Sequence, residues 1–224
     1  MSDRLRSGVL FDVDGTLADT NYLHTMAWSR ALHDVGEWAP MNAIHRLIGM
    51  GGDQLVPTVL GHESSAAANA RPSRYKELIG EARIYPGAHD LIWRLHNEGI
   101  AVVIATSAPG DELDSLLELL DADKAIDAVT TADDVESSKP DPEVFRKAMA
   151  AGAIDPCRAL AVGDSVWDVQ AARAAGIGCI GVETGGFSQH ELAEAGAVRV
   201  YRDVQELLDQ FLTGPLANLT TGSR

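Results

Sequence analysis

The sequence has few cysteines and no apolar run long enough to cross a membrane. Its two cysteines, Cys157 and Cys179, form no CxxC pair, so we expect two reduced, mostly buried thiols. No segment approaches the roughly 20 apolar residues that a membrane-spanning helix needs. The run Gly8–Phe11 is stopped by Asp12 and is too short for the apolar part of a signal peptide. These features predict a soluble cytoplasmic protein with no membrane partner.

Positive charge is also scarce. The chain carries 18 lysines and arginines against 33 aspartates and glutamates, which gives a formal net charge of −15. A surface of this sign repels nucleic acid and anionic lipid, so neither is an expected partner. It would repel a phosphorylated substrate as well. A phosphate site in this chain therefore needs its own positive charge, from a metal ion, a lysine or helix N-termini.

Three familiar functional motifs are missing. No GxxxxGK[ST] occurs, which argues against a P-loop nucleotide site. Residues 49–52 (GMGG) neither match GxGxxG nor follow a predicted strand, so we do not expect a dinucleotide site. The seven histidines form no HExxH zinc motif. The chemistry of the chain must therefore rest on other residues.

Strand-length apolar runs alternate with helical patterns through most of the chain. The predicted strands are Gly8–Val13, Ile100–Ala105, Ala125–Val129, Ala159–Val162 and Ile177–Val182. The predicted helices are Ala88–Asn97, Asp111–Leu120, Pro142–Ala151, Val166–Ala175 and Val204–Leu212. This alternation predicts an α/β fold in which helices cover both faces of a parallel sheet.

The interval from residue 19 to residue 83 breaks this alternation, because its pattern is helical throughout. We therefore predict that residues 1–18 and 84–212 form the α/β core and that residues 19–83 form an inserted all-helical unit. The insertion follows the first strand, at the edge where open α/β sheets bind ligands, and a helical unit there can act as a lid. Residues 213–224 lack periodicity, so we expect a flexible tail.

Two aspartates follow the first predicted strand, within the segment Phe11–Thr16 (FDVDGT). Gly15 lets the backbone turn, so the carboxylates of Asp12 and Asp14 can converge on one point. Such a pair is tolerable if a divalent cation binds between the carboxylates or if one of them holds a proton. An ordinary Asp-Gly turn explains the same residues. Taken alone, the segment does not decide between a turn and a catalytic or metal-binding pair of carboxylates.

Further polar residues follow later strands or precede helices. Thr106 and Ser107 end the second predicted strand, Lys139 precedes a predicted helix, and Asp164 and Asp168 lie at the start of another. Each has an ordinary explanation: hydroxyls and acids stabilise helix N-termini, and most lysines are solvated. Together they place acids, hydroxyls and a lysine at successive edges on one side of a sheet. We therefore predict a single site there.

Four motifs, in this order, resemble those of the haloacid dehalogenase superfamily of hydrolases: DVDGT at Asp12–Thr16, ATS at Ala105–Ser107, SKPDPEVF at Ser138–Phe145 and VGDSVWD at Val162–Asp168. The resemblance covers nearly the whole chain. It implies a Rossmann-like core, with residues 19–83 as the helical cap domain. It also implies a magnesium-dependent phosphatase that acts on a small phosphorylated metabolite, within a subfamily similar to phosphoglycolate phosphatases and β-phosphoglucomutases.

The resemblance assigns roles to the acidic residues. Asp12 would be the nucleophile that forms a transient aspartyl-phosphate, and Asp14 would be the acid and base. Mg²⁺ would be bound by the Asp12 carboxylate, the backbone carbonyl of Asp14 and Asp164. Asp168 would complete the metal site directly or through a water molecule.

The resemblance also assigns substrate contacts. Thr106, Ser107 and Lys139 would bind the phosphoryl group, and Lys139 would offset the charge of Asp12 during catalysis. The stretch Asp19–His24 is similar to the cap entrance of β-phosphoglucomutases, which implies that His24 couples cap closure to the acid/base aspartate. A half-buried histidine on an amphipathic helix explains this stretch equally well.

Two other functions fit part of the pattern. A phosphosugar mutase must hold a second phosphate, and this chain has Gly52 where the related mutases carry a cap arginine, so we favour a hydrolase. A non-catalytic phospho-acceptor module uses a similar set of acids, a hydroxyl and a lysine, but must preserve its aspartyl-phosphate. Asp14 and the helical insertion favour an enzyme. Haloacid dehalogenases themselves lack the second aspartate, so Asp14 also argues against dehalogenation.

Overall fold

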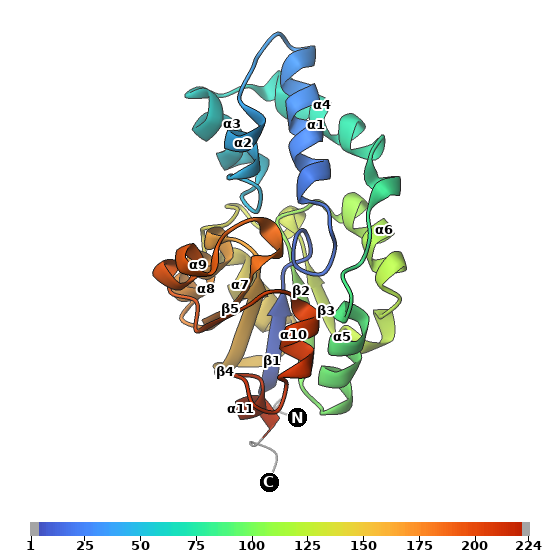
Figure 1. Cartoon of the computed structure of the whole chain (residues 1–224), viewed down its shortest axis with the longest axis vertical. Coiled ribbons are helices and arrows are strands. Elements are labelled where there is room, and N and C mark those ends of the chain that lie inside the picture. The colour runs from blue at the N-terminus through green and yellow to red at the C-terminus, as the bar shows by residue number, and fades with distance from the viewer. Residues whose placement is uncertain (1–4, 221–224) are drawn as a thin grey trace.

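The computed structural model describes residues 5–220, and a parallel sheet forms its centre (Figure 1). The strands are β1 (Arg6–Phe11), β2 (Ala101–Ala105), β3 (Ala128–Thr130), β4 (Ile154–Gly163), β5 (Gly178–Val182) and β6 (Arg199–Tyr201). They lie in the order β3-β2-β1-β4-β5-β6, and every neighbouring pair is parallel. In such a doubly wound sheet the strand order reverses next to β1, which is where ligands bind.

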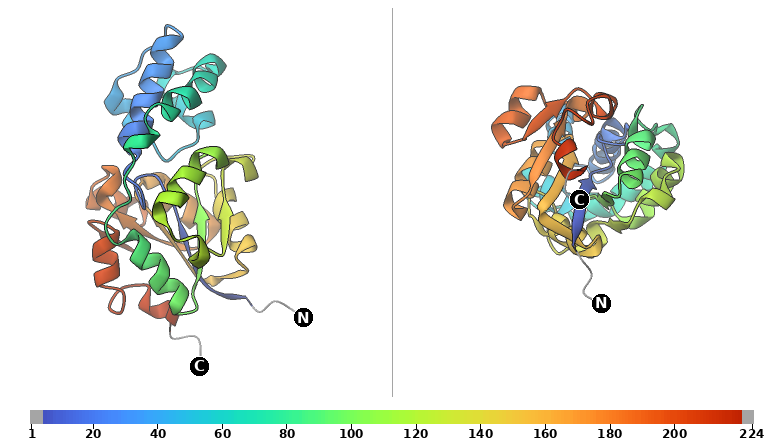
Figure 2. Two further views of the ribbon diagram at one scale, coloured as in Figure 1. Left: turned by 90° about the vertical axis from the view of Figure 1, so that its right-hand side faces the viewer. Right: turned by 90° about the horizontal axis from the view of Figure 1, so that it is seen from below.

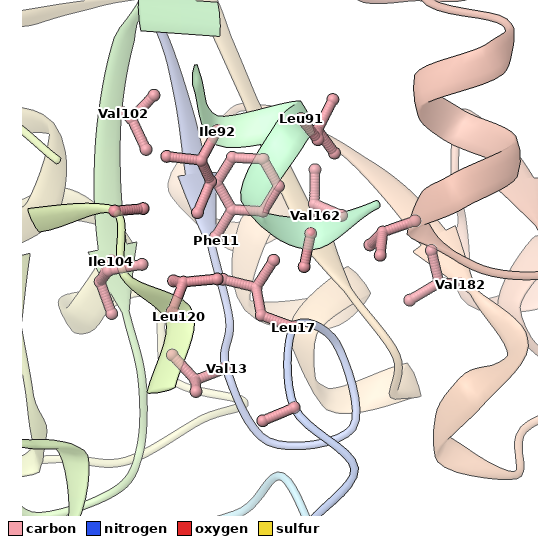
Figure 3. Close-up of a cluster of buried hydrophobic side chains, with 14 of the residues drawn as sticks. Phe11, Val13, Leu17, Leu91, Ile92, Val102, Ile104, Leu120, Val162 and Val182 are labelled. Atoms are coloured by element: carbon pink, nitrogen blue, oxygen red, sulfur yellow. The ribbon is translucent and has the colours of Figure 1, made fainter. Parts of the chain in front are cut away.

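Helices cover both faces of the sheet, as predicted (Figure 2). One face carries α5 (Ala88–Asn97), α6 (Gly110–Leu120) and α10 (Val204–Asp209), and the other carries α7 (Glu143–Ala151), α8 (Val166–Ala175) and α9 (Gln189–Ala195). The apolar residues of β1 alternate between the two cores: Val9 and Phe11 pack on the first side, and Leu10 packs on the second. Figure 3 labels several members of the first core, including Phe11, Leu91 and Val162.

Four further helices stand beyond the carboxyl ends of the strands (Figure 1). They are α1 (Asn21–Asp34), α2 (Met41–His45), α3 (Gly52–Leu60) and α4 (Ser65–Lys76), and the short 3₁₀ turn η1 (Ile79–Glu81) follows them. Buried residues such as Trp28, Ile44 and Leu55 give these helices an apolar core of their own. The interval in which the sequence predicts only helices is therefore helical in the structure.

The chain enters and leaves this helical layer side by side. Ala18 and Ile84 form an antiparallel bridge. The backbone N–H of Asp19 donates to the carbonyl of Arg83 at 2.8 Å, and that of Tyr85 donates to Leu17 at 2.9 Å. We call this paired segment the neck, made of residues 17–19 and 83–85. It is the covalent link between the helical layer and the sheet.

The sequence pattern did not predict strand β6 or helix α9. Strand β6 has only three residues, lies at the sheet edge and is partly exposed, so it lacks an apolar run. Helix α9 has seven residues and is marked mainly by a capping box between Ser188 and Glu191, which hydrophobic periodicity does not reveal. Short elements of this kind depend on contacts with the rest of the sheet more than on their own pattern.

The predicted flexible tail is wrong for residues 213–220. Leu216 and Leu219 are buried, and α11 (Ala217–Thr220) packs against the start of β1. Ser7 donates a hydrogen bond from Oγ to the carbonyl of Leu219 at 3.1 Å. These contacts hold a segment whose composition suggested a loop. Residues 221–224 lie outside the described part of the chain.

Both cysteines are free, as expected, but only Cys179 is buried; Cys157 lies on an exposed part of β4. The exposure of Cys157 contradicts the prediction of two mostly buried thiols. Between residues 5 and 220, no helix has the length and apolar character that crossing a membrane requires.

Candidate active site

Asp12 lies directly beyond the carboxyl end of β1, in the middle of the sheet. Its backbone N–H donates to the carbonyl of Val162 in β4 at 3.0 Å, which continues the strand pairing by one residue. The side chain is buried, and its Oδ1 accepts a hydrogen bond from Nζ of Lys139 at 2.6 Å. Gly15 has a φ of +75°, a conformation that glycine adopts far more readily than other residues. The chain turns there, next to Asp12.

Lys139 is a fully buried positive charge at the base of the site. It precedes α7, and its Nζ lies 2.6 Å from Asp12 and 2.8 Å from Oδ1 of Asp168. Burial alone would lower the pKa of Lys139, but the two carboxylates outweigh this effect and raise the pKa above its ordinary value. Lys139 therefore stays charged and offsets the negative charge around Asp12.

Three buried carboxylates gather at this point. Asp12, Asp164 and Asp168 each offer an oxygen within 4.8 Å of the others, and Oδ2 of Asp12 has no hydrogen-bond partner. Burial raises the pKa of Asp12, and the neighbouring carboxylates add to this rise against the opposing charge of Lys139. Carboxylate oxygens are the ligands that Mg²⁺ prefers, and a cation would relieve their repulsion. The residues present therefore fit a divalent metal ion.

Asp164 is held from both sides. Its Oδ1 accepts a hydrogen bond from Thr16 at 3.1 Å, and its Oδ2 accepts one from Nδ2 of Asn21 at 2.8 Å. Burial, followed by the charge of Asp168, raises the pKa of Asp164 to about 7. Asn21 is the first residue of α1, so the helical layer touches the acidic cluster directly. Gly185 packs so closely against Asp164 that a side chain at this position would collide with Oδ2 of Asp164.

Asp168 is tied into the framework of the site. Its Oδ2 accepts hydrogen bonds from the backbone N–H and the hydroxyl of Ser165, at 3.2 and 2.5 Å. Ser165 in turn accepts from the backbone N–H of Asp168, which completes a capping box at the start of α8. The other oxygen contacts Lys139. Asp168 therefore fixes both the helix start and the lysine.

The side chain of Asp14 is not part of the carboxylate cluster. Its Oδ1 accepts a hydrogen bond from Thr20 at 2.6 Å and lies 2.7 Å from Nε2 of His24. Burial alone would raise the pKa of Asp14, but the hydrogen bonds from His24 and Thr20 and the charge of Arg71 lower it. The contact between His24 and Asp14 that the resemblance implied is therefore present. Metal binding by the backbone carbonyl of Asp14 stays a prediction.

His24 is held by one aromatic and one cationic neighbour from α4. Its ring stacks on Tyr75 with a centroid distance of 4.2 Å. Its Nδ1 contacts Nη2 of Arg71. A guanidinium can only donate, so Nδ1 accepts and Nε2 carries the hydrogen that His24 donates to Asp14. Arg71 thus selects one tautomer of His24.

A cavity of about 400 Å³ separates the helical layer from the carboxyl ends of the strands. Asp12 and Asp14 lie on its wall, together with Thr106 and Ser107 after β2. The hydroxyl of Thr106 accepts from the backbone N–H of Ala108 at 3.0 Å, which fixes its orientation. Ser107 donates to the carbonyl of Gly49 at 3.3 Å and so links the core to the loop between α2 and α3.

The structure brings every predicted site residue to this one edge: Asp12, Asp14, His24, Thr106 and Ser107 line the cavity, and Lys139, Asp164 and Asp168 surround Asp12 behind it. The sequence analysis missed four residues that hold this set: Thr16, Thr20, Asn21 and Arg71. The only signal for Arg71 was its spacing of four residues from Tyr75, which puts both on one helix face.

Comparison with known proteins identifies one family. The sequence pattern of the haloacid dehalogenase-like hydrolases matches residues 9–182. Protein CbbY of Cereibacter sphaeroides is 32% identical, over 93% of this chain and 98% of its own length. A phosphoglycolate phosphatase of Rhodospirillum rubrum is also 32% identical, over 90% of this chain and 89% of its own.

Solved structures agree with this assignment. The crystal structure of a hydrolase from Pseudomonas syringae superimposes with a TM-score of 0.87 at 33% identity. The superposition covers 92% of this chain and 98% of the hydrolase. The sheet and the helical layer described above therefore occur together in an experimentally determined relative.

Proposed function

Because the chain belongs to the haloacid dehalogenase-like hydrolases and is a phosphatase of small phosphate esters, we propose that Asp12 is its nucleophile and that Mg²⁺ is its metal. One observation carries the proposal: the buried Asp12 carboxylate, with an unpartnered oxygen, faces a fixed lysine and two further carboxylates at the carboxyl end of β1. Because the chain belongs to a family of enzymes, the alternative of a non-catalytic phospho-acceptor module is set aside.

In the first step an oxygen of Asp12 attacks phosphorus, and the bond from phosphorus to the leaving oxygen breaks. The leaving oxygen takes a proton from the carboxyl group of Asp14. The backbone and hydroxyls of Thr106 and Ser107 bind phosphoryl oxygens, and Lys139 offsets the negative charge that gathers there. The product of this step is an aspartyl-phosphate on Asp12 and a free alcohol.

In the second step Asp14 acts in its ionised form. Its carboxylate accepts a proton from a water molecule, whose oxygen attacks the phosphorus and releases phosphate from Asp12. Hydrogen bonds from Thr20 and His24 keep the pKa of Asp14 low in the ligand-free protein, so the carboxylate is ready as a base. A bound phosphoryl dianion adds negative charge nearby and raises the pKa of Asp14. The higher pKa favours the protonated carboxyl group that the first step needs.

The metal would be held by the carboxylates of Asp12 and Asp164, with Asp168 behind them. When bound, Mg²⁺ supplies positive charge that neutralises the phosphoryl oxygens and the carboxylate cluster. Thr16 and Asn21 keep the oxygens of Asp164 oriented. Outer contacts of this kind affect metal affinity as well as geometry.

We further propose that residues 19–83 act as a cap domain over a core made of residues 1–18 and 84–212. The apolar core of α1–α4, the neck and the cavity between the two parts support this division. His24 and Asn21 extend from α1 to Asp14 and Asp164, so movement of the cap would alter both contacts. The small phosphorylated substrate would enter when the cap opens.

Multiple turnover of p-nitrophenyl phosphate tests the proposed function. We expect many equivalents of product per enzyme in Mg²⁺ and background hydrolysis in an excess of chelator, with full recovery when Mg²⁺ is restored. The metal is needed because it neutralises charge on both the phosphoryl group and the nucleophile. A single turnover followed by a stable phosphoprotein would contradict the phosphatase assignment.

A mutase remains the second candidate, because Arg71 brings to the cavity a cap cation that the sequence analysis did not foresee. Glu112 already neutralises this arginine, and Gly52 offers no other charge. We therefore favour hydrolysis. Phosphorus NMR on β-glucose 1-phosphate, with a trace of the 1,6-bisphosphate, separates the two: inorganic phosphate supports the hydrolase, and accumulating glucose 6-phosphate supports the mutase.

Asp164 and Asp168 should respond differently to substitution. Asp164→Asn should raise the Mg²⁺ concentration for half-maximal rate by about tenfold or more, because it weakens the metal site. Asp168→Asn should raise it less but should cost about 3 kcal/mol or more in stability, because it leaves the buried Lys139 with one partner fewer. Magnesium titrations and urea unfolding of both variants measure the two effects. The opposite order in the titrations would exchange the two roles.

A further inference from the structure

An ion pair joins the helical layer to the core beside the cavity. Arg71 of α4 donates through Nη1 to Oε1 of Glu112 in α6. The side chains of Arg71 and Glu112 are only 10% and 8% exposed. The mechanism proposed above uses neither residue to touch the phosphoryl group. The ion pair therefore has no direct part in binding the transferring phosphoryl group.

Two of the three guanidinium nitrogens of Arg71 already have polar partners. Nη1 contacts Glu112, Nη2 contacts His24, and Nε is buried without a partner. The guanidinium also lies over the rings of Tyr75 and Trp28, at 4.8 and 5.8 Å from their centroids. Packing on both rings and two polar contacts hold the group in one orientation. Unless it displaces Glu112, an anionic ligand would meet a guanidinium whose charge is already neutralised.

Displacing Glu112 is costly. Its Oε2 is buried and already has no hydrogen-bond partner. Removing Arg71 from Oε1 as well would leave a buried carboxylate unpaired, and unpaired buried charges are strongly unfavourable. A carboxylate or phosphate on the substrate would also have to lie close to Glu112, whose charge repels it.

Arg71 is the one lysine or arginine among the described residues that line the cavity. Away from the nucleophile, the other charged residues on the wall are acidic: Asp53 at the start of α3 and Glu136 in the loop before α7. With Glu112 neutralising Arg71, this part of the cavity carries a net negative charge. The remaining wall is largely apolar and includes Trp28 and Pro109.

We propose that Glu112 is a specificity-determining residue: by neutralising Arg71, it makes the enzyme select phosphate monoesters with an uncharged leaving group and reject esters that carry a second anionic group. This inference rests on the proposed function, because it concerns the same cavity. Glu112 sets which leaving group is accepted, and Asp12 and Asp14 perform the chemistry on it.

Two matched pairs of esters test the proposal, each differing only in a terminal CH₂OH or COO⁻ group. They are 2-hydroxyethyl phosphate against 2-phosphoglycolate, and sorbitol 6-phosphate against 6-phosphogluconate. Binding is measured by calorimetry with Mg²⁺ in Asp12→Asn, which should bind without turning over, and kcat/KM is measured in the parent enzyme. In at least the longer pair, the hydroxyl member should be favoured by about tenfold or more in both measurements.

Glu112→Gln is then introduced into both the Asp12→Asn variant and the parent enzyme. It should lower the preference for the hydroxyl member by about tenfold or reverse it, because the amide leaves the charge of Arg71 unneutralised. Glu118→Gln is the matched control. It removes the same charge from an exposed position on the same helix and should leave the preference unchanged. Thermal unfolding of each variant checks that the fold is intact.

Stronger binding of the carboxylate members by the unsubstituted cavity would overturn the proposal and would make Arg71 a receptor for anions. An unchanged preference in folded Glu112→Gln would overturn it too. Should Glu112→Gln fail to fold, the preference in the unsubstituted cavity still decides. Binding without any hydrolysis in the parent enzyme would instead contradict the proposed function, while the binding ratios would still test the role of Glu112.

Discussion

Replacing Asp12 by asparagine should reduce hydrolysis to background, a loss of at least about four orders of magnitude in kcat. The amide has nearly the shape of the carboxylate but is a very poor nucleophile. It also removes one negative partner from Lys139, which holds Asp12 at 2.6 Å, and one oxygen ligand from the carboxylate cluster. Release of phosphate from an alkyl phosphate over many turnovers measures the loss.

The control for this variant is Asp114→Asn, on the exposed side of α6. It makes the same chemical change away from the site and should keep the parent rate. Circular dichroism and thermal unfolding show whether the Asp12 variant is folded. Retention of about a hundredth of the parent rate or more by a folded Asp12→Asn would contradict covalent catalysis by this residue.

Replacing Asp14 by asparagine should lower kcat for an alkyl phosphate by about two to four orders of magnitude, the usual contribution of a positioned acid and base. An amide can neither protonate the leaving oxygen nor accept a proton from water. Magnesium binding should persist, because the side chain of Asp14 lies with Thr20 and His24 and apart from the carboxylate cluster. Steady-state rates and a magnesium titration measure the two quantities.

The leaving group provides the control for Asp14. p-Nitrophenolate needs little help from an acid, so formation of the aspartyl-phosphate should suffer less with p-nitrophenyl phosphate than with an alkyl ester. Its breakdown still needs a base, so a burst of nitrophenol followed by slow turnover is expected. An unchanged rate with the alkyl phosphate would remove Asp14 from the mechanism.

The elements that were predicted well carry strong local signals. The bounds of α5 and α8 agree with the predicted helices, because an apolar stripe and polar flanks mark both. Strand β1 was found from the apolar run Gly8–Phe11 in its second part, as expected for a strand covered on both faces, and its polar first residues Arg6 and Ser7 lay outside the prediction. The catalytic candidates followed from the ends of such strands, since parallel strands bring their carboxyl ends to a single edge.

The residues that tune the site could not be found in this way. Arg71 and Glu112 are 41 positions apart, and nothing local indicates that α4 crosses to meet α6. Asn21 lies 143 positions before Asp164, and only the fold brings the amide to the carboxylate. Each looks like an ordinary polar residue of a helix. Their significance depends on how the helical layer is seated on the sheet, which periodicity does not encode.

The neck has a consequence for how such a chain can diversify. Because residues 17–19 and 83–85 pair side by side, the covalent connections of the whole intervening segment to the rest of the protein lie at one narrow point. Segments whose ends lie close together can be lengthened, shortened or exchanged without disturbing the surrounding chain. Recombination could therefore graft a foreign helical segment between Ala18 and Ile84 and transfer a new preference for leaving groups, provided that the new segment again supplies residues that hold Asp14 and Asp164 as His24 and Asn21 do.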